Sequence, residues 1–311
     1  MDLCLHIGAH RTARGTFQNY LTCNAEALAH LGIAICSPGM THNSLLKVET
    51  PKNYKEPRND RLSRSEARVA LNLARASDIG ADWLVVSDTA FIGPIGTTQT
   101  NSLYADIGQR MARFCAAFDH KVRRIALNIR SYESFWASLL SAEIENGRAP
   151  LKTGDLEKLV QSSRRWRDVI TDLACAMPGT EIQVMPFEEY AGMPERALEQ
   201  MTNTTDLPRN YAREWLNRAP SLEYLRKIME ERGDNPERLP FDSGRWQPFD
   251  KAQQSQLREA YADDLYWLRS GADGHAVLKE NKRTVRLRGS VATGRTDRGR
   301  RRNGIEDRHL A

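Results

Sequence analysis

The 311-residue sequence has no apolar run of the roughly 18 residues that a membrane-spanning helix needs. Its first residues also lack the charged stretch followed by an apolar stretch that is typical of a secretory signal peptide. These two absences predict a cytoplasmic protein without a membrane span.

Cysteine is scarce, and its five positions show none of the paired spacings of metal-binding or redox motifs. The positions are Cys4, Cys23, Cys36, Cys115 and Cys175. This pattern predicts reduced cysteines that mostly pack as small buried hydrophobes, and it predicts no metal site.

Acidic residues are few in the last part of the chain. Residues 281–311 carry ten Lys/Arg and three Asp/Glu, a net +7, which leaves −2 of the total +5 for the rest. We therefore expect a nearly neutral folded body that does not bind nucleic acid. The basic tail, placed at residues 276–311, has too few apolar residues to pack. It either stays disordered or contacts an anionic partner.

Apolar segments of strand length alternate along the chain with segments of helical periodicity. The expected strands are residues 3–7, 32–36, 83–87, 124–130 and 181–185, and the expected helices are residues 15–30, 66–76, 103–118, 132–144, 155–177, 222–229 and 251–268. Residues 40–65 are expected to form a long polar loop. The alternation predicts an α/β fold, a P-loop NTPase-like doubly wound parallel sheet with a helical C-terminal part, in one domain of residues 1–275.

The first expected strand runs through a turn into the first expected helix, which is the arrangement of a phosphate-binding loop. Gly8 and Gly15 let the backbone approach an anion, and the helix N-terminus directs N–H groups toward it. Arg11 and Arg14 add guanidinium donors. The Walker sequence is absent, because Ala13 and Arg14 stand where it requires Gly and Lys. Plain strand–turn–helix packing therefore remains an alternative.

A second cationic position follows the fourth expected strand. The strand ends at Arg130, and Ser138 lies eight residues further on, about two turns into the next helix. Because the carboxyl ends of parallel strands share one edge of a sheet, we expect Arg130 to face the same crevice as the loop after Gly8. Two separate cationic anchors suit a ligand with phosphates at two places. The alternative is a surface arginine and a serine that packs between helices.

These two segments resemble those of one family when they are taken together. Residues 6–18 resemble the 5′-phosphosulfate-binding loop of sulfotransferases, bacterial ones included, that use 3′-phosphoadenosine 5′-phosphosulfate (PAPS). Arg130 followed by Ser138 resembles the family's 3′-phosphate signature. Residues 83–88, 217–221 and 248–268 are similar to further segments of the family, so the resemblance covers about residues 3–270.

The resemblance implies transfer of a sulfuryl group from PAPS to a hydroxyl or amine of a small-molecule or carbohydrate acceptor, without a metal. Arg11 stands at the family's lysine position and would stabilise the leaving phosphate. Arg130 and Ser138 would hold the 3′-phosphate. The residues implied for the 5′-phosphate are Thr12, Ala13, Arg14, Gly15 and Thr16.

The acceptor must lose a proton, and two residues are candidates for the base. His42 lies in the polar loop and has a near-neutral intrinsic pKa, and Asp88 follows an expected strand. A solvated loop histidine and a helix N-cap are the respective alternatives. Two other functions stay open, a P-loop kinase-like ATP-dependent transferase and a non-catalytic nucleotide-binding protein.

Overall fold

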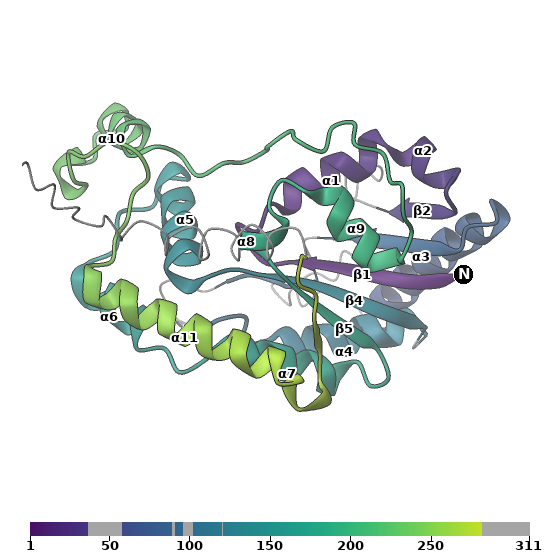
Figure 1. Ribbon diagram of the computed structural model, residues 1–311. Coiled ribbons are helices and arrows are strands. Elements are labelled where there is room, and N and C mark those ends of the chain that lie inside the picture. Colours follow the sequence, from purple (N-terminus) through teal and green to yellow (C-terminus); the bar gives the residue numbers. More distant parts are fainter. Residues whose placement is uncertain (37–57, 89–90, 96–101, 120, 282–311) are drawn as a thin grey trace, which may run out of the picture. The chain divides into compact units, whose positions relative to one another are not determined.

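The computed structural model describes residues 1–36, 58–88, 91–95, 102–119 and 121–281 (Figure 1). His42 and residues 282–311 of the predicted tail lie outside these ranges. Met1–Lys279 form one compact unit. No helix in the described ranges is both long and apolar enough to cross a membrane.

The described part of the chain contains one sheet of six strands, and every pair of neighbouring strands is parallel. The strands are β1 (Asp2–Gly8), β2 (Ile33–Cys36), β3 (Trp83–Ser87), β4 (Val122–Ile129), β5 (Glu181–Pro186) and β6 (Val277–Leu278). Their order across the sheet is β2-β3-β1-β4-β5-β6. This topology confirms the predicted α/β fold with a doubly wound parallel sheet. The two residues of β6, which fall inside the range predicted as tail, pair with β5.

The central strands are buried on both faces, which explains their continuous apolar sequences. In β1, Leu3, Leu5 and Ile7 belong to one buried cluster, and Cys4 belongs to the other. In β4, the same alternation sends Ala126 to the second cluster. A strand in the middle of this sheet therefore has no polar face for solvent.

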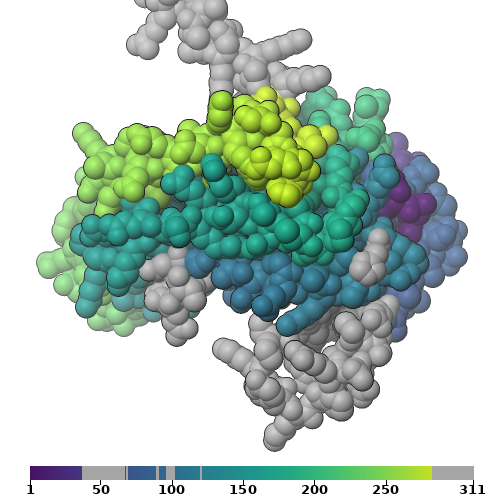
Figure 2. All heavy atoms as spheres, turned by 90° about the horizontal axis from the view of Figure 1, so that it is seen from below, coloured from purple at the N-terminus to yellow at the C-terminus, as the bar shows by residue number. Residues whose placement is uncertain are grey.

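Helices cover both faces of the sheet. They are α1 (Arg14–Cys23), α2 (Ala25–Ala29), α3 (Arg58–Asp78), α4 (Ile107–Ala117), α5 (Tyr132–Glu145), α6 (Thr153–Val160), α7 (Trp166–Ala176), α8 (Phe187–Tyr190), α9 (Pro194–Thr202), α10 (Leu222–Glu231) and α11 (Lys251–Arg269), with 3-10 turns at Pro236–Arg238 and Ala272–Gly274. Figure 1 shows α1 and α9 on one face and α4, α7 and α11 on the other. In the view from below, α11, coloured yellow-green, lies along the teal α7, which precedes β5 (Figure 2). The helical C-terminal part is thus as predicted.

The single helix predicted over residues 155–177 is wrong, because the chain breaks it into α6 and α7. Trp166 is fully buried, and its backbone N–H donates to the Tyr132 hydroxyl at 2.6 Å. The N–H of Arg165 donates to Asp168 at 2.7 Å, which caps the new helix start. Helical periodicity on both sides of the break hides these tertiary contacts from the sequence.

Two other helix boundaries also differ from the prediction. The helix predicted over residues 15–30 is interrupted at Asn24, whose side-chain amide donates to the carbonyls of Tyr20 and Asn210. Helix α3 begins at Arg58, so the polar loop predicted over residues 40–65 is too long at its end.

None of the five cysteines, which all lie in the described ranges, forms a disulfide bond. Cys4, Cys36 and Cys115 are buried, and Cys23 and Cys175 are exposed. Burial raises the pKa of the Cys4 and Cys36 thiols to about 12, so both stay protonated at neutral pH.

Candidate functional site

The loop between β1 and α1 lies where two neighbouring strands end together. Gly8 pairs with Asn128 in the parallel register of β1 and β4, and the N–H of Ala9 donates to the Asn128 carbonyl at 3.4 Å. Arg130 directly follows β4. The register therefore brings the loop and Arg130 to the same edge of the sheet, where the sequence predicted them.

The loop backbone adopts a conformation that ordinary residues avoid. Arg11 and Ala13 both have φ of 61°, in the left-handed region, which costs a non-glycine residue on the order of 1–3 kcal/mol. Two hydrogen bonds hold this shape. The Thr12 hydroxyl donates to the Ala9 carbonyl at 2.7 Å, and Arg130 Nη1 donates to the Arg11 carbonyl at 2.7 Å. Arg130 thus fixes the loop backbone directly.

Four of the predicted site residues line one cavity of about 270 Å³, namely Arg11, Ala13, Arg130 and Ser138. Arg11 Nε donates to the Ser138 hydroxyl oxygen at 2.9 Å, which joins the loop to α5. The cavity is near the lower end of the roughly 300–1,000 Å³ typical of small-ligand sites.

The cavity also has walls that the sequence did not assign. Arg218 and Arg245 contribute two further guanidinium groups, and Phe187 and Trp215 contribute rings. The Phe187 ring lies 4.3 Å from the Arg130 guanidinium, a cation–π distance. Arg218 lies in residues 217–221, one of the segments that carry the resemblance to sulfotransferases. Arg245 has no such signal, because its segment has neither periodicity nor a motif.

The charges around this cavity are unbalanced. Its lining, as far as the described residues go, has four arginines and no carboxylate. Burial lowers the pKa of Arg130 to about 10, with Glu188 opposing the change and Arg245 and Arg11 adding to it. Burial also lowers the pKa of Arg11. Both groups remain protonated at neutral pH, so an anionic ligand would relieve their desolvation and mutual repulsion.

One atom of Arg130 lacks a partner. Its Nε is buried and makes no hydrogen bond to any described residue, while the residue as a whole is 8% exposed. An unpaired donor on a buried cation is costly, so it favours an incoming acceptor.

Several predicted residues lie outside the lining of this cavity, namely Thr12, Arg14, Gly15, Thr16 and Asp88. Arg14 Nη1 donates to the Gly8 carbonyl at 3.4 Å, and nearby Asp88 partly offsets the lowering of the Arg14 pKa by burial. Neither Arg14 nor Asp88 is among the residues that line the cavity. Asp88, the predicted base at the end of β3, is 3% exposed. His42, the other predicted base, lies outside the described residues.

The remaining loop residues contact the chain itself. The Thr16 hydroxyl oxygen accepts the N–H of Leu216 at 3.0 Å. Thr12 and Thr16 border a second, water-sized cavity of about 20 Å³. A Cβ added at Gly15 would stand 2.9 Å from the Asn217 amide nitrogen, so this close approach requires glycine.

Two neutral histidines support the loop. His6 is 2% exposed, and its ring nitrogens lie 2.8 Å from the Ser87 hydroxyl oxygen and 2.8 Å from Asn128 Oδ1. His10 Nδ1 lies 2.9 Å from the Tyr104 hydroxyl oxygen. Burial, the largest cause, lowers both histidine pKa values from 6.5 to about 4, and positive charge from Arg14 adds to this. Both rings are therefore uncharged at neutral pH.

These pKa values predict acid destabilisation between pH 6.5 and 4. In this window the two histidines bind protons in the unfolded chain but not in the folded chain. Their contribution to the free energy of unfolding is therefore complete above pH 6.5 and falls as the pH drops toward 4. A shift of this size corresponds to about 3 kcal/mol for each histidine. Urea unfolding at pH 7, 5.5 and 4.5 measures the slope, which His6→Gln should reduce. His30→Gln, at an exposed position, is the control, and an unchanged slope in His6→Gln would contradict the prediction.

Comparison with known proteins gives no family for this chain, since it matches no protein-family model and no curated protein. Within the described ranges, no three or more His, Cys, Asp and Glu side chains gather closely enough to hold a metal ion.

Proposed function

We propose that the chain is a sulfotransferase-like protein that binds PAPS in the arginine-lined cavity. The acceptor would be a hydroxyl or amine of a small molecule or carbohydrate. The observation that carries this proposal is the meeting of Arg11, Ser138 and Arg130 at one cavity, since Arg11 and Arg130 are 119 residues apart in sequence. These are the residues that the resemblance to sulfotransferases places at the donor.

The residues present fit a ligand with two phosphate groups. Four guanidinium groups border the cavity without a carboxylate among the described lining residues, and the buried Nε of Arg130 lacks a partner there. Guanidinium forks match the geometry of phosphate oxygens. A nucleotide with negative charge at both the 5′ and 3′ positions supplies the charge that this cavity needs.

The donor supplies an activated sulfuryl group. In the proposed reaction the bond between sulfur and the 5′-phosphate oxygen breaks, and a new bond forms from sulfur to the acceptor oxygen or nitrogen. The acceptor proton passes to a base, and adenosine 3′,5′-bisphosphate is released. The arginines hold the anionic groups. His42 and Asp88 remain the proposed bases. Because Asp88 is buried, His42 is the first candidate of the two.

Isothermal titration calorimetry tests the ligand class. Adenosine 3′,5′-bisphosphate should bind at least about tenfold more tightly than ATP with Mg²⁺. Only the bisphosphate carries a 3′-phosphate, whose charge-assisted contact with Arg130 is worth about 1.5–3 kcal/mol. Tighter binding of ATP would favour the kinase-like alternative.

Turnover is measured in the same protein by transfer of labelled sulfate from PAPS to phenols, amino sugars and other saccharides. If the bisphosphate binds but none of these acceptors is labelled, the result favours a non-catalytic nucleotide-binding protein over an enzyme.

A further inference from the structure

We infer that Arg11 is a ligand of the 3′-phosphate, together with Arg130 and Ser138. This assignment rests on the proposed function and changes one part of it. The place of Arg11 in the loop implies contact with the leaving 5′-phosphate, whereas its contacts place it at the other end of the nucleotide.

Both the side chain and the backbone of Arg11 are tied to the segment that begins at the end of β4. Arg11 Nε donates to the Ser138 hydroxyl oxygen at 2.9 Å, and the Arg11 carbonyl accepts Arg130 Nη1 at 2.7 Å. The left-handed φ of 61° at Arg11 belongs to this arrangement. A residue held at two points by Arg130 and Ser138 lies in their subsite.

The free donors of this group suit one phosphate. Arg11 uses only Nε toward the described residues, so its two Nη atoms remain for a ligand. The Ser138 hydroxyl oxygen accepts from Arg11 and keeps its own proton to donate. Two guanidinium groups and one hydroxyl therefore converge on a single anion, and a monoanionic or neutral group would leave their charge unbalanced.

The 5′ end of the nucleotide then meets mainly backbone donors. Helix α1 begins at Arg14, after Ala13 in the left-handed conformation, and its first N–H groups are available to an anion. The Arg14 side chain lies against Gly8, close enough for its Cβ to stand 3.0 Å from a Cβ added there. The site consequently reads the 3′-phosphate with two arginines and the 5′ group with none from the loop.

A calorimetric test with three nucleotides distinguishes contacts to the 3′-phosphate from contacts to the 5′-phosphate. Adenosine 3′,5′-bisphosphate, adenosine 3′-phosphate and adenosine 5′-phosphate are titrated into the wild-type protein and into Arg11→Ala. We expect Arg11→Ala to lose about 10- to 100-fold in affinity for the two nucleotides with a 3′-phosphate, the range of a charge-assisted hydrogen bond, and less than about twofold for adenosine 5′-phosphate.

Two variants make this result interpretable. Arg226→Ala removes an arginine of α10 that does not line the cavity and should change none of the three affinities. Arg11→Lys keeps the charge but loses the fork, so it should show a smaller loss with the same preference for the 3′-phosphate. It also decides the matter if Arg11→Ala does not fold.

Other outcomes overturn the inference. A loss confined to the 5′-phosphate nucleotides puts Arg11 at the leaving group, and equal losses for all three remove it from either subsite, while the proposed function survives both results. If the wild-type protein binds none of the three nucleotides, the proposed function fails, and the assignment of Arg11 fails with it.

Discussion

Replacing Arg130 by alanine is expected to weaken binding of adenosine 3′,5′-bisphosphate by about 30- to 1,000-fold, and that of adenosine 5′-phosphate by less than about tenfold. Removing one member of a buried, hydrogen-bonded charge pair costs roughly 2–4 kcal/mol, because the other member loses its partner. Arg130 is 8% exposed, and burial has already lowered its pKa to about 10. A desolvated cation of this kind gains more from an anion than a surface arginine does.

Part of this loss would act through the loop. Arg130 Nη1 holds the carbonyl of Arg11, so Arg130→Ala also releases the strained backbone there. That indirect effect explains why a modest change for adenosine 5′-phosphate is expected as well.

Arg245→Ala provides the matched control for Arg130→Ala. Arg245 lines the same cavity but is exposed, so Arg245→Ala should weaken the binding of each nucleotide by no more than about fivefold. Calorimetry on both variants gives the comparison. If Arg130→Ala loses affinity equally for the two nucleotides, Arg130 does not recognise the 3′-phosphate.

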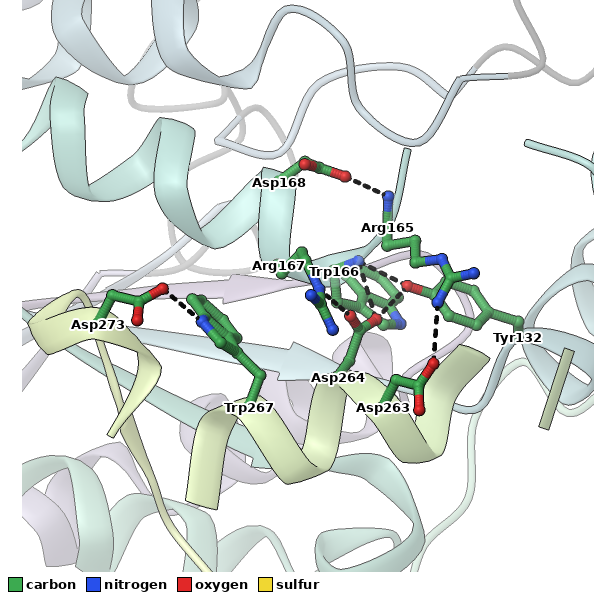
Figure 3. A network of polar contacts seen from close by, with 9 residues as sticks. All are labelled: Tyr132, Arg165, Trp166, Arg167, Asp168, Asp263, Asp264, Trp267 and Asp273. Atoms are coloured by element: carbon green, nitrogen blue, oxygen red, sulfur yellow. Dashed lines mark hydrogen bonds and ion pairs between the residues drawn. The ribbon is translucent and has the colours of Figure 1, made fainter. Parts of the chain in front are cut away.

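Replacing Asp264 by alanine is expected to lower the free energy of unfolding by about 3–5 kcal/mol. The Asp264 carboxylate is completely buried on α11. It accepts the Tyr132 hydroxyl at 2.5 Å and the backbone N–H of Trp166 at 3.3 Å, and it pairs with Arg167 Nε at 3.1 Å (Figure 3). One carboxylate thus joins α11 to the starts of α5 and α7, and its loss leaves buried donors unsatisfied.

The preceding residue on the same helix supplies the control. Asp263 is 68% exposed and contacts Arg165 Nη1 at 3.4 Å, so Asp263→Ala should cost no more than about 1 kcal/mol. Urea denaturation monitored by circular dichroism measures both variants. Similar small losses for the two would mean that the network of Figure 3 does not hold the C-terminal helix in place.

The same network reaches the candidate site. The Trp166 indole N–H donates to the Arg130 carbonyl at 2.9 Å, so the buried tryptophan supports the backbone from which the Arg130 side chain extends. A destabilised Asp264→Ala protein that still folds at low temperature should therefore be compared with the wild type in bisphosphate binding only below its melting range.

The sequence alone determined the parallel character of the sheet, five of its six strands and the approximate place of the candidate site. Strands buried on both faces are mostly apolar, so β1, β3 and β4 are visible as runs, and helical segments between them favour parallel pairing. Parallel pairing brings strand ends together. It follows without coordinates that the loop after Gly8 and the residues after Ile129 meet at one edge.

Only the tertiary structure decided how the side chains at that edge are used. Local periodicity cannot show that Trp166 starts a new helix, since the reason is its contact with Tyr132 from α5. A charged residue at a loop position likewise does not reveal in which direction its side chain points. Arg11 turns to Ser138, a residue of another element, whereas Arg14 turns back to Gly8 within the loop. Arg245 joins the cavity through contacts between segments distant in sequence. A long, flexible cation is placed by its partners rather than by its neighbours in the chain.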